Sequence, residues 1–280
     1  RFKCDWSSDV CSSDLRSIAQ ACGQSLEPAL LEQLSQCCSG LSEQRIRQVA
    51  ADGTVSSLAG TAPAPDFLAT KAAGGLADGK GDAALFDEPV GLCFDGSHLY
   101  VTEVANHTVR QVALDGTVVT LAGAGSSGFA DAKGAAAKFN KPTGCAVAGG
   151  MVYVADSGNQ RIRAVASDGT VTTFAGTGTA GLLNGAAASA TFAQPWGLAV
   201  GGDGALYVAD ALNHAVRKVA QGKVSTLAGT GSQGFKDAAP TLAQFFEPTG
   251  VVWVSVGKWL VLDARNQRIR VITDPSAACQ

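Results

Sequence analysis

The stretch from Pro142 to Val165 reads PTGCAVAGGMVYVADSGNQRIRAV and contains three short apolar runs separated by two turns. The runs at 143–148, 151–155 and 161–165 have the length and the small, apolar or alternating composition of β-strands. Gly, Asp, Ser and Asn between the runs are the residues that tight turns favour. A further run, TVTTFA at 170–175, follows after another turn. The stretch therefore predicts a four-stranded antiparallel meander.

This four-stranded unit recurs along the chain. Equivalent prolines stand 53 residues apart, namely Pro89, Pro142, Pro195 and Pro248. A phenylalanine, a glycine, an asparagine and an arginine recur with them, and one extra residue falls in the turn at 201–204. One meander exposes both of its faces and is marginally stable by itself. Copies that cover one another around a common axis form a β-propeller, so the repeat predicts an all-β fold and excludes a helical solenoid.

The repeated stretches resemble a known family. PTGCAVAGGMVYVADSGNQRIRAV and PWGLAVGGDGALYVADALNHAVRKV are similar to the NHL repeat, and the tails DGTVVTLAG, DGTVTTFAG and GKVSTLAG resemble its long bacterial form. The resemblance covers about residues 44–273. It implies a β-propeller, commonly of six blades, that serves as a binding platform, and only some relatives are enzymes. A fold alone does not assign a function.

The blades in the chain form an incomplete set. Four copies carry the first three strands, and the last copy stops near Ile272 without a closing strand. RIRQV at 45–49 and TVSSLAG at 54–60 supply the last two strands of an earlier copy. We expect four to five blades in an incomplete ring, with TVSSLAG either paired with the carboxy-terminal blade or placed in a half blade, and with further blades lost upstream. A closed ring of four blades is the alternative.

Two segments precede the propeller, which we assign to residues 42–280. Residues 1–15 contain DWSSDVCSSDL, which lacks an apolar period and resembles a translated sequencing adapter, so we exclude them as an artefact that is expected to be disordered. Residues 16–41 carry a plausible N-cap at Ser25, Pro28 in the first turn and Gly40 as a stop signal. Leucines and cysteines at helical spacing between them predict a short helix.

Composition limits the classes of partner. The net charge is -3 and the isoelectric point is about 5.6, which argues against a nucleic-acid surface. No apolar run is long enough for a membrane-spanning helix. No motif predicts a cofactor, because the glycine-rich pieces lack the lysine of a phosphate loop and no GxSxG elbow is present. We therefore expect a protein, peptide or glycan ligand.

Acidic, amide and arginine side chains recur around the turn after the second strand of each copy. An acid at this position, an asparagine three residues later and an arginine four residues after that can bond to one another and to nearby backbone. Recurrence in every copy favours a structural role over a single metal site. The copies that match the pattern fully contribute Asp156, Asn159, Arg163, Asp210, Asn213, Arg217, Asp263, Asn266 and Arg270.

Histidines and cysteines suggest no catalytic or metal centre. His107 and His214 follow the repeated asparagine, where the other copies have glutamine, and are expected to be surface turn residues. Cys93 and Cys145 differ in strand parity, so we expect them to face opposite ways as small buried residues. The remaining cysteines could pair in three ways, and a bridge from Cys279 would join the two ends; they are Cys22, Cys37, Cys38 and Cys279. Cysteine pairs predict an extracytoplasmic protein that is periplasmic, on the cell surface or secreted. The resemblance to the long bacterial form of the repeat implies a bacterial source.

The side chains that vary within the constant frame are the candidate ligand-binding residues. They directly precede or follow the repeated proline and are expected to ring one mouth of the central channel: Glu88, Lys141, Gln194, Trp196 and Glu247. We predict a non-catalytic binding module with its ligand at the blade rim, although a solvated turn would show the same pattern. The alternative is a metal-assisted lyase or lactonase in the channel, which a divalent cation near Glu88 and Glu247 would favour.

Overall fold

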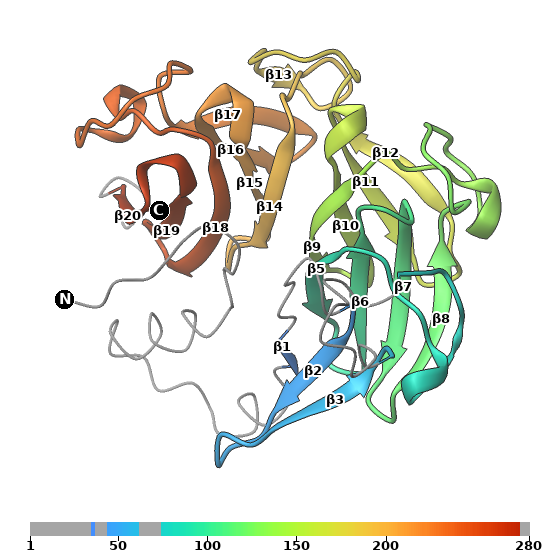
Figure 1. Ribbon diagram of the computed structural model, residues 1–280. Helices are drawn as coiled ribbons and strands as arrows, with labels where there is room; N and C mark the ends of the chain where they lie inside the picture. Colours follow the sequence, from blue (N-terminus) through green and yellow to red (C-terminus); the bar gives the residue numbers. More distant parts are fainter. Residues whose placement is uncertain (1–34, 37–43, 62–73, 275–280) are drawn as a thin grey trace.

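The computed structural model describes residues 35–36, 44–61 and 74–274, which form five antiparallel β-sheets. Figure 1 shows the sheets in chain order around an arc, from the blue first sheet to the red fifth sheet. We call them blades 1 to 5. The described residues contain strands and short 3-10 turns but no α-helix, so the predicted all-β class is confirmed.

The strands of the five blades have the following bounds. Blade 1 contains β1 (Ser35–Gln36), β2 (Ile46–Val49) and β3 (Val55–Ala59). Blade 2 contains β4 (Gly79–Lys80), β5 (Pro89–Phe94), β6 (His98–Glu103), β7 (Thr108–Ala113) and β8 (Thr117–Ala122). Blade 3 contains β9 (Pro142–Ala148), β10 (Met151–Asp156), β11 (Arg161–Ala166) and β12 (Val171–Ala175). Blade 4 contains β13 (Gly185–Ala186), β14 (Pro195–Val200), β15 (Leu206–Asp210), β16 (Ala215–Ala220) and β17 (Lys223–Ala228). Blade 5 contains β18 (Pro248–Ser255), β19 (Lys258–Asp263) and β20 (Arg268–Thr273).

Each blade is a meander in which consecutive strands pair. In blade 3, Tyr153 of β10 lies opposite Ala146 of β9 on one side and Ala164 of β11 on the other. In blades 2 and 4 the short strands β4 and β13 add a fifth strand outside the fourth strand. The turns after the second strands of blades 3, 4 and 5 are 3-10 turns: η3 (Ser157–Asn159), η4 (Ala211–Asn213) and η6 (Ala264–Asn266). Three further 3-10 turns lie between blades: η1 (Gly81–Ala83), η2 (Gly134–Ala136) and η5 (Pro240–Leu242).

The hydrophobic core lies between blades. Four clusters of buried side chains each join residues of two neighbouring blades. One of them contains Tyr100 and Val109 of blade 2 together with Val152 and Val165 of blade 3. Alternate residues of one strand therefore serve different interfaces, since Leu99 and Val101 belong to the cluster between blades 1 and 2. Stacking of this kind buries both faces of an internal sheet.

The innermost strands β5, β9, β14 and β18 lie against one another through glycine. A Cβ atom on Gly91 would overlap the carbonyl oxygen of Thr143 in the next blade, and one on Gly144 would overlap that of Trp196. Gly197 meets the carbonyl oxygen of Thr249 in the same way. The glycine after each repeated proline thus lets the backbones of adjacent blades approach closely.

The five sheets agree with the expected four to five blades. TVSSLAG forms β3 and pairs with β2 in the short blade 1, which agrees with the half-blade placement and not with closure of the carboxy-terminal blade. A closed ring of four blades is excluded because blade 1 is a fifth sheet. The helix expected over 16–41 lies outside the described residues except at Ser35 and Gln36, which form β1 and pair with β2. Residues 1–15 also lie outside them.

The prediction for Cys93 and Cys145 is also wrong, because the two residues form a disulfide between β5 and β9, with Cα atoms 5.8 Å apart. Cys93 and Cys145 do stand at alternate positions of their strands, which would point them to opposite faces of one sheet. The two strands, however, belong to different blades. The face of one blade meets the opposite face of the next, so residues of opposite parity point into the same interface. The four other cysteines considered for pairing lie outside the described residues.

Candidate binding site at the blade rim

A buried carboxylate organises the turn after the second strand in blades 2 to 5. In blade 3, Asp156 accepts hydrogen bonds from the backbone N–H of Asn140 at 2.8 Å and from Asn159 Nδ2 at 2.8 Å. Its Oδ2 also lies 2.7 Å from Nη1 of Arg163, and neither side chain of this pair is exposed. Equivalent bonds from arginine to carboxylate join Arg110 to Glu103, Arg217 to Asp210 and Arg270 to Asp263.

Each arginine also ties its blade to the preceding connection. Nη2 of Arg163 donates to the backbone oxygen of Ala130 at 2.9 Å and to Asp131 Oδ1 at 2.5 Å. Its guanidinium lies over the buried ring of Phe139, with 5.2 Å between Cζ and the ring centroid. These contacts explain in physical terms why Phe, Asp, Asn and Arg recur together. The structural role of the set stays a prediction, to be tested by substitution.

Burial and hydrogen bonding act in opposite directions on these carboxyl groups. Burial raises the pKa of Asp210 to about 6, while the donors Asn213, Ala193 N–H and Arg217 oppose the shift. Burial raises the pKa of Asp156 as well. The three donors around each group favour the ionised carboxylate, which accepts hydrogen bonds from its turn.

The residue before each repeated proline has a left-handed backbone. Glu88, Lys141, Gln194 and Glu247 all have φ between 49° and 51°. This region is unfavourable for residues other than glycine and is retained where surrounding contacts hold it. The same unusual geometry in four blades shows that the position is fixed by the repeat, while its side chain differs from blade to blade.

A side chain of the preceding blade holds each of these residues. His107 Nδ1 accepts the backbone N–H of Lys141 at 3.1 Å, and His214 Nδ1 accepts that of Glu247 at 3.1 Å. In the other two cases the acceptor is a glutamine oxygen. Gln44 Oε1 accepts the backbone N–H of Glu88 at 2.7 Å, and Gln160 Oε1 accepts that of Gln194 at 2.5 Å. These histidines and glutamines are therefore links between blades.

Sequence reasoning missed this link and assigned His107 and His214 to surface turns. The signal was present, since the chain alternates between histidine and glutamine at one repeat position, and both can offer an unprotonated acceptor. For His107, burial lowers the pKa from the ordinary value of 6.5, and the charge of Lys141 adds to the effect. A lowered pKa keeps the ring neutral and able to accept.

The candidate ligand-binding residues differ in their solvent exposure and in whether their side chains are engaged in ion pairs. Lys141 and Gln194 are exposed, whereas Glu88 and Glu247 are half-buried. Glu247 Oε2 lies 2.8 Å from Nε of Arg265, so its carboxylate is engaged in an ion pair. Trp196 is 36% exposed at the start of the innermost strand β14. The backbone N–H of each of the four residues before proline donates to a side chain of the preceding blade. Within the described residues no three His, Cys, Asp or Glu side chains gather as metal ligands.

Comparisons with known proteins agree with this architecture. A model of the NHL repeat matches residues 192–219. The chain is 27% identical to protein SUPPRESSOR OF QUENCHING 1, chloroplastic, of Arabidopsis thaliana over 71% of this chain and 26% of that protein. It is 29% identical to NHL repeat-containing protein 2 of Homo sapiens over 73% of this chain and 34% of that protein. The chain thus spans about a quarter to a third of the length of these relatives.

A solved structure shares the fold at low sequence identity. The crystal structure of an auxiliary nutrient binding protein from Bacteroides thetaiotaomicron has a TM-score of 0.61 and 16% identity, over 85% of this chain and 55% of that chain. Repeat sequence and sheet topology together define a β-propeller, and residues 192–219 of blade 4 match the NHL repeat. The chain is similar in sequence to NHL-repeat proteins. Within the part of the chain that the structure describes, no helix is long and apolar enough to cross a membrane.

Proposed function

We propose that the chain is a non-catalytic binding module that recognises a protein, peptide or glycan through its blade rim. The observation that carries the proposal is the common backbone of Glu88, Lys141, Gln194 and Glu247, which is fixed by a link from the preceding blade and bears a different side chain each time. Such a frame holds ligand-contacting groups in place before the ligand arrives, which reduces the entropic cost of binding.

Trp196 is the expected anchor of the ligand. Its neighbours in the sequence are proline and glycine, and its ring is partly exposed. Exposed aromatic residues contribute a large share of binding energy at protein interfaces, and their flat faces also stack on sugars or peptide groups. Lys141 and Gln194 lie before the innermost strands of blades 3 and 4 and add exposed donors on either side of the same blade interface.

The test is a screen of peptide and glycan arrays with the purified chain, followed by titration of the hits. Trp196→Ala should weaken a genuine rim ligand about 30-fold, as expected for an aromatic hot spot. Val256→Ala is the matched control, because Val256 is exposed and follows β18 at the strand end opposite Glu247. Hits that bind Trp196→Ala and the wild type equally would contradict the proposal. A divalent cation bound by Glu88 and Glu247 would support the metal-assisted lyase or lactonase instead.

We further propose that the protein is bacterial and works outside the cytoplasm. The bond between Cys93 and Cys145 supports the location outside the cytoplasm, since disulfides persist in oxidising compartments and are rare where glutathione keeps thiols reduced. Mass spectrometry of protein recovered from its native cells without reductant tests the idea. Free thiols at both positions would contradict it.

A further inference from the structure

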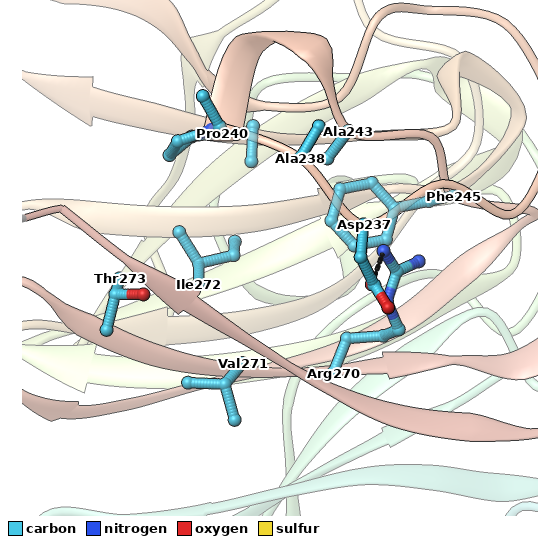
Figure 2. A pocket seen from close by; sticks show the side chains of 11 residues that line it. Asp237, Ala238, Pro240, Ala243, Phe245, Arg270, Val271, Ile272 and Thr273 are labelled. Carbon is cyan, nitrogen blue, oxygen red and sulfur yellow. Dashed lines mark hydrogen bonds and ion pairs between the residues drawn. The ribbon is translucent and has the colours of Figure 1, made fainter.

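Blade 4 differs from blades 2, 3 and 5 at one repeat position in the connection before the innermost strand. The other three blades have an aspartate there and blade 4 has an asparagine; in chain order the residues are Asp78, Asp131, Asn184 and Asp237. In every case Nη2 of the arginine in the third strand donates to this side chain. Figure 2 shows the bond in blade 5, where a dashed line joins Asp237 to Arg270. Asn184 is therefore the neutral member of a set whose other members are carboxylates.

The neutral amide leaves the arginine of blade 4 with one carboxylate instead of two. In blades 2, 3 and 5 this arginine pairs with the aspartate of the connection and with the acid at the end of the second strand. Among the described residues, Arg217 pairs with the acid of its second strand, Asp210, alone. Because a hydrogen bond between two charged groups is stronger than one from a cation to a neutral amide, a carboxylate at residue 184 would hold Arg217 more firmly.

Asn184 is followed by glycine, and no other Asn-Gly pair occurs in the sequence. The backbone nitrogen of glycine has no side chain to shield it, so it can approach the side-chain carbon of the preceding asparagine and close a five-membered ring. Asn184, Gly185 and Ala186 are all exposed. A Cβ atom on Gly185 would have no atom of the described residues within 4 Å. The pair is thus open to solvent and uncrowded.

A short ladder holds the backbone after Asn184. β13 consists of Gly185 and Ala186, which lie opposite Val224 and Lys223 of β17. An exposed strand of two residues opens locally at a small fraction of the free energy of global unfolding. Opening of β13 therefore frees the amide of Gly185 for reaction while the blade stays folded.

Two donors converge on the side-chain oxygen of Asn184. Nη2 of Arg217 lies 2.7 Å from Oδ1, and Oγ1 of Thr226 lies 3.2 Å from it. Arginine has no acceptor, so the atom that faces it is the oxygen of the amide. Arg217 is fully buried, which fixes its position. Donors fixed at a carbonyl oxygen stabilise the negative charge that develops there when a nucleophile attacks the carbon, so the pair forms an oxyanion hole.

We propose that Asn184 is a site of spontaneous deamidation, which gives blade 4 the carboxylate that the other blades carry. The amide nitrogen of Gly185 loses its proton to solvent base and bonds to Cγ of Asn184. The bond from Cγ to Nδ2 then breaks, and ammonia leaves with a proton from water, so that a succinimide ring remains. Water opens the ring at Cγ to give aspartate, or at the backbone carbonyl to give isoaspartate. No group is oxidised or reduced, and the protein gains one negative charge.

The two products have opposite effects on blade 4. Aspartate places a second carboxylate beside Arg217, as in the other blades. Isoaspartate carries the main chain through its Cβ atom, which lengthens the backbone by one atom just before β13 and disturbs the pairing of Gly185 with Val224. The inference is independent of the proposed rim ligand, because it rests on the connection and the third and fourth strands of one blade.

Timed incubation of the purified chain in mildly alkaline buffer tests the proposal. We expect ion-exchange chromatography to show an acidic species that accumulates with time, and faster at higher hydroxide concentration. Mass spectrometry of a digest should place the exchange of NH2 for OH at residue 184, with fragmentation that separates aspartate from isoaspartate. Absence of the exchange at residue 184 would overturn the proposal.

A matched pair of variants tests the role of the donors. Thr226→Val removes one donor from Asn184 Oδ1 and should slow the reaction about tenfold, the effect of one hydrogen bond. Thr173→Val removes the equivalent threonine of blade 3, which donates to Asp131, and should leave the rate at residue 184 unchanged. Equal rates in Thr226→Val and the wild type would contradict the oxyanion hole.

Asn184→Asp supplies the aspartate product directly. This variant should unfold at a higher urea concentration than freshly purified wild type, because Arg217 then meets two carboxylates. It should also form none of the time-dependent acidic species. A lower unfolding midpoint would contradict the claim that deamidation completes the ion pairs of blade 4.

Discussion

At the scale of single residues, buried ion pairs and their hydrogen bonds maintain the turns that carry the rim. Arg110, Arg163 and Arg217 are fully buried, and each meets a carboxylate that is buried as well. Removing one member of such a pair leaves an uncompensated charge, which costs far more than the pair contributes relative to an apolar replacement. The arginine therefore cannot be lost alone.

We expect Arg163→Ala to lower the free energy of unfolding by about 3–5 kcal/mol, because Asp156 is left buried without its cation. Urea denaturation measures this. Lys133→Ala is the control, since its bond to Asp168 joins two exposed side chains and should contribute little to stability. Affinity for a rim ligand should be nearly unchanged by Arg163→Ala. Normal stability with lost binding would show that the arginine serves the ligand.

The link from His107 to Lys141 should make stability depend on pH. The neutral ring accepts the Lys141 N–H at Nδ1, and protonation removes that lone pair. Because the pKa of His107 is lowered in the folded state, its contribution is present above pH 6.5 and is lost as pH falls through the folded pKa. His107→Gln keeps an acceptor that does not titrate, as at Gln160.

The measurement is the free energy of unfolding of both proteins between pH 5 and pH 7.5. The two should agree near pH 7.5, and the wild type should lose about 1 kcal/mol more than His107→Gln by the acidic end. The other histidines are common to both proteins and cancel in the difference. Parallel curves, or a steeper loss in the variant, would refute the link.

At this scale the sequence predicts groups of side chains that are close in the chain, but not contacts between residues that are far apart in it. The grouping of Asp156, Asn159 and Arg163 is readable because the residues are close in the chain and recur. The partner of His107 is 34 residues away in the next blade, and only the stacking geometry brings the two together. Whether Glu88, Lys141, Gln194, Trp196 and Glu247 bind a ligand remains a prediction for the same reason.

At the scale of strands, the contact between innermost strands sets how closely blades approach. Gly91, Gly144 and Gly197 each face a carbonyl oxygen of the next blade at a distance that leaves no room for a Cβ atom. Backbone cannot move aside as a flexible side chain can, so a methyl group there must separate two sheets.

Gly144→Ala should therefore destabilise the protein by about 2–3 kcal/mol, measured by chemical denaturation. Gly250→Ala provides the comparison within the same repeat. A Cβ atom there would meet Cβ of Leu262 in its own blade at 3.2 Å and no carbonyl of a further blade. Its cost should be clearly smaller. Equal losses would indicate that the glycines are needed for local conformation only.

Strand boundaries followed from turn residues and alternation, because those signals are local. The pairing of TVSSLAG with β2 was open from sequence, since the pattern fits the edge of any third strand equally well. The disulfide was missed because parity was compared as though Cys93 and Cys145 lay in one sheet. Two residues on equivalent strands of stacked sheets meet only when their side chains point to opposite faces of their own sheets, because the facing surfaces of neighbouring blades are opposite faces.

At the scale of the whole molecule, the bond between Cys93 and Cys145 fastens blade 2 to blade 3 and closes a loop of 52 residues. The double variant Cys93→Ala, Cys145→Ala should lose about 2–4 kcal/mol of stability through the greater freedom of its unfolded chain. Thermal denaturation of both proteins measures the loss. A peptide pair linked through these two cysteines should appear in an unreduced digest of the wild type and be absent from the variant.

The location of the hydrophobic clusters has a consequence for how the molecule comes apart. Within the described residues, blades 2, 3 and 4 each contribute side chains to two clusters, whereas blades 1 and 5 each contribute to one. Cooperativity then passes only from neighbour to neighbour. Among the five described blades, blades 2 and 3, which the disulfide joins, should therefore be the last pair to separate on heating or pulling.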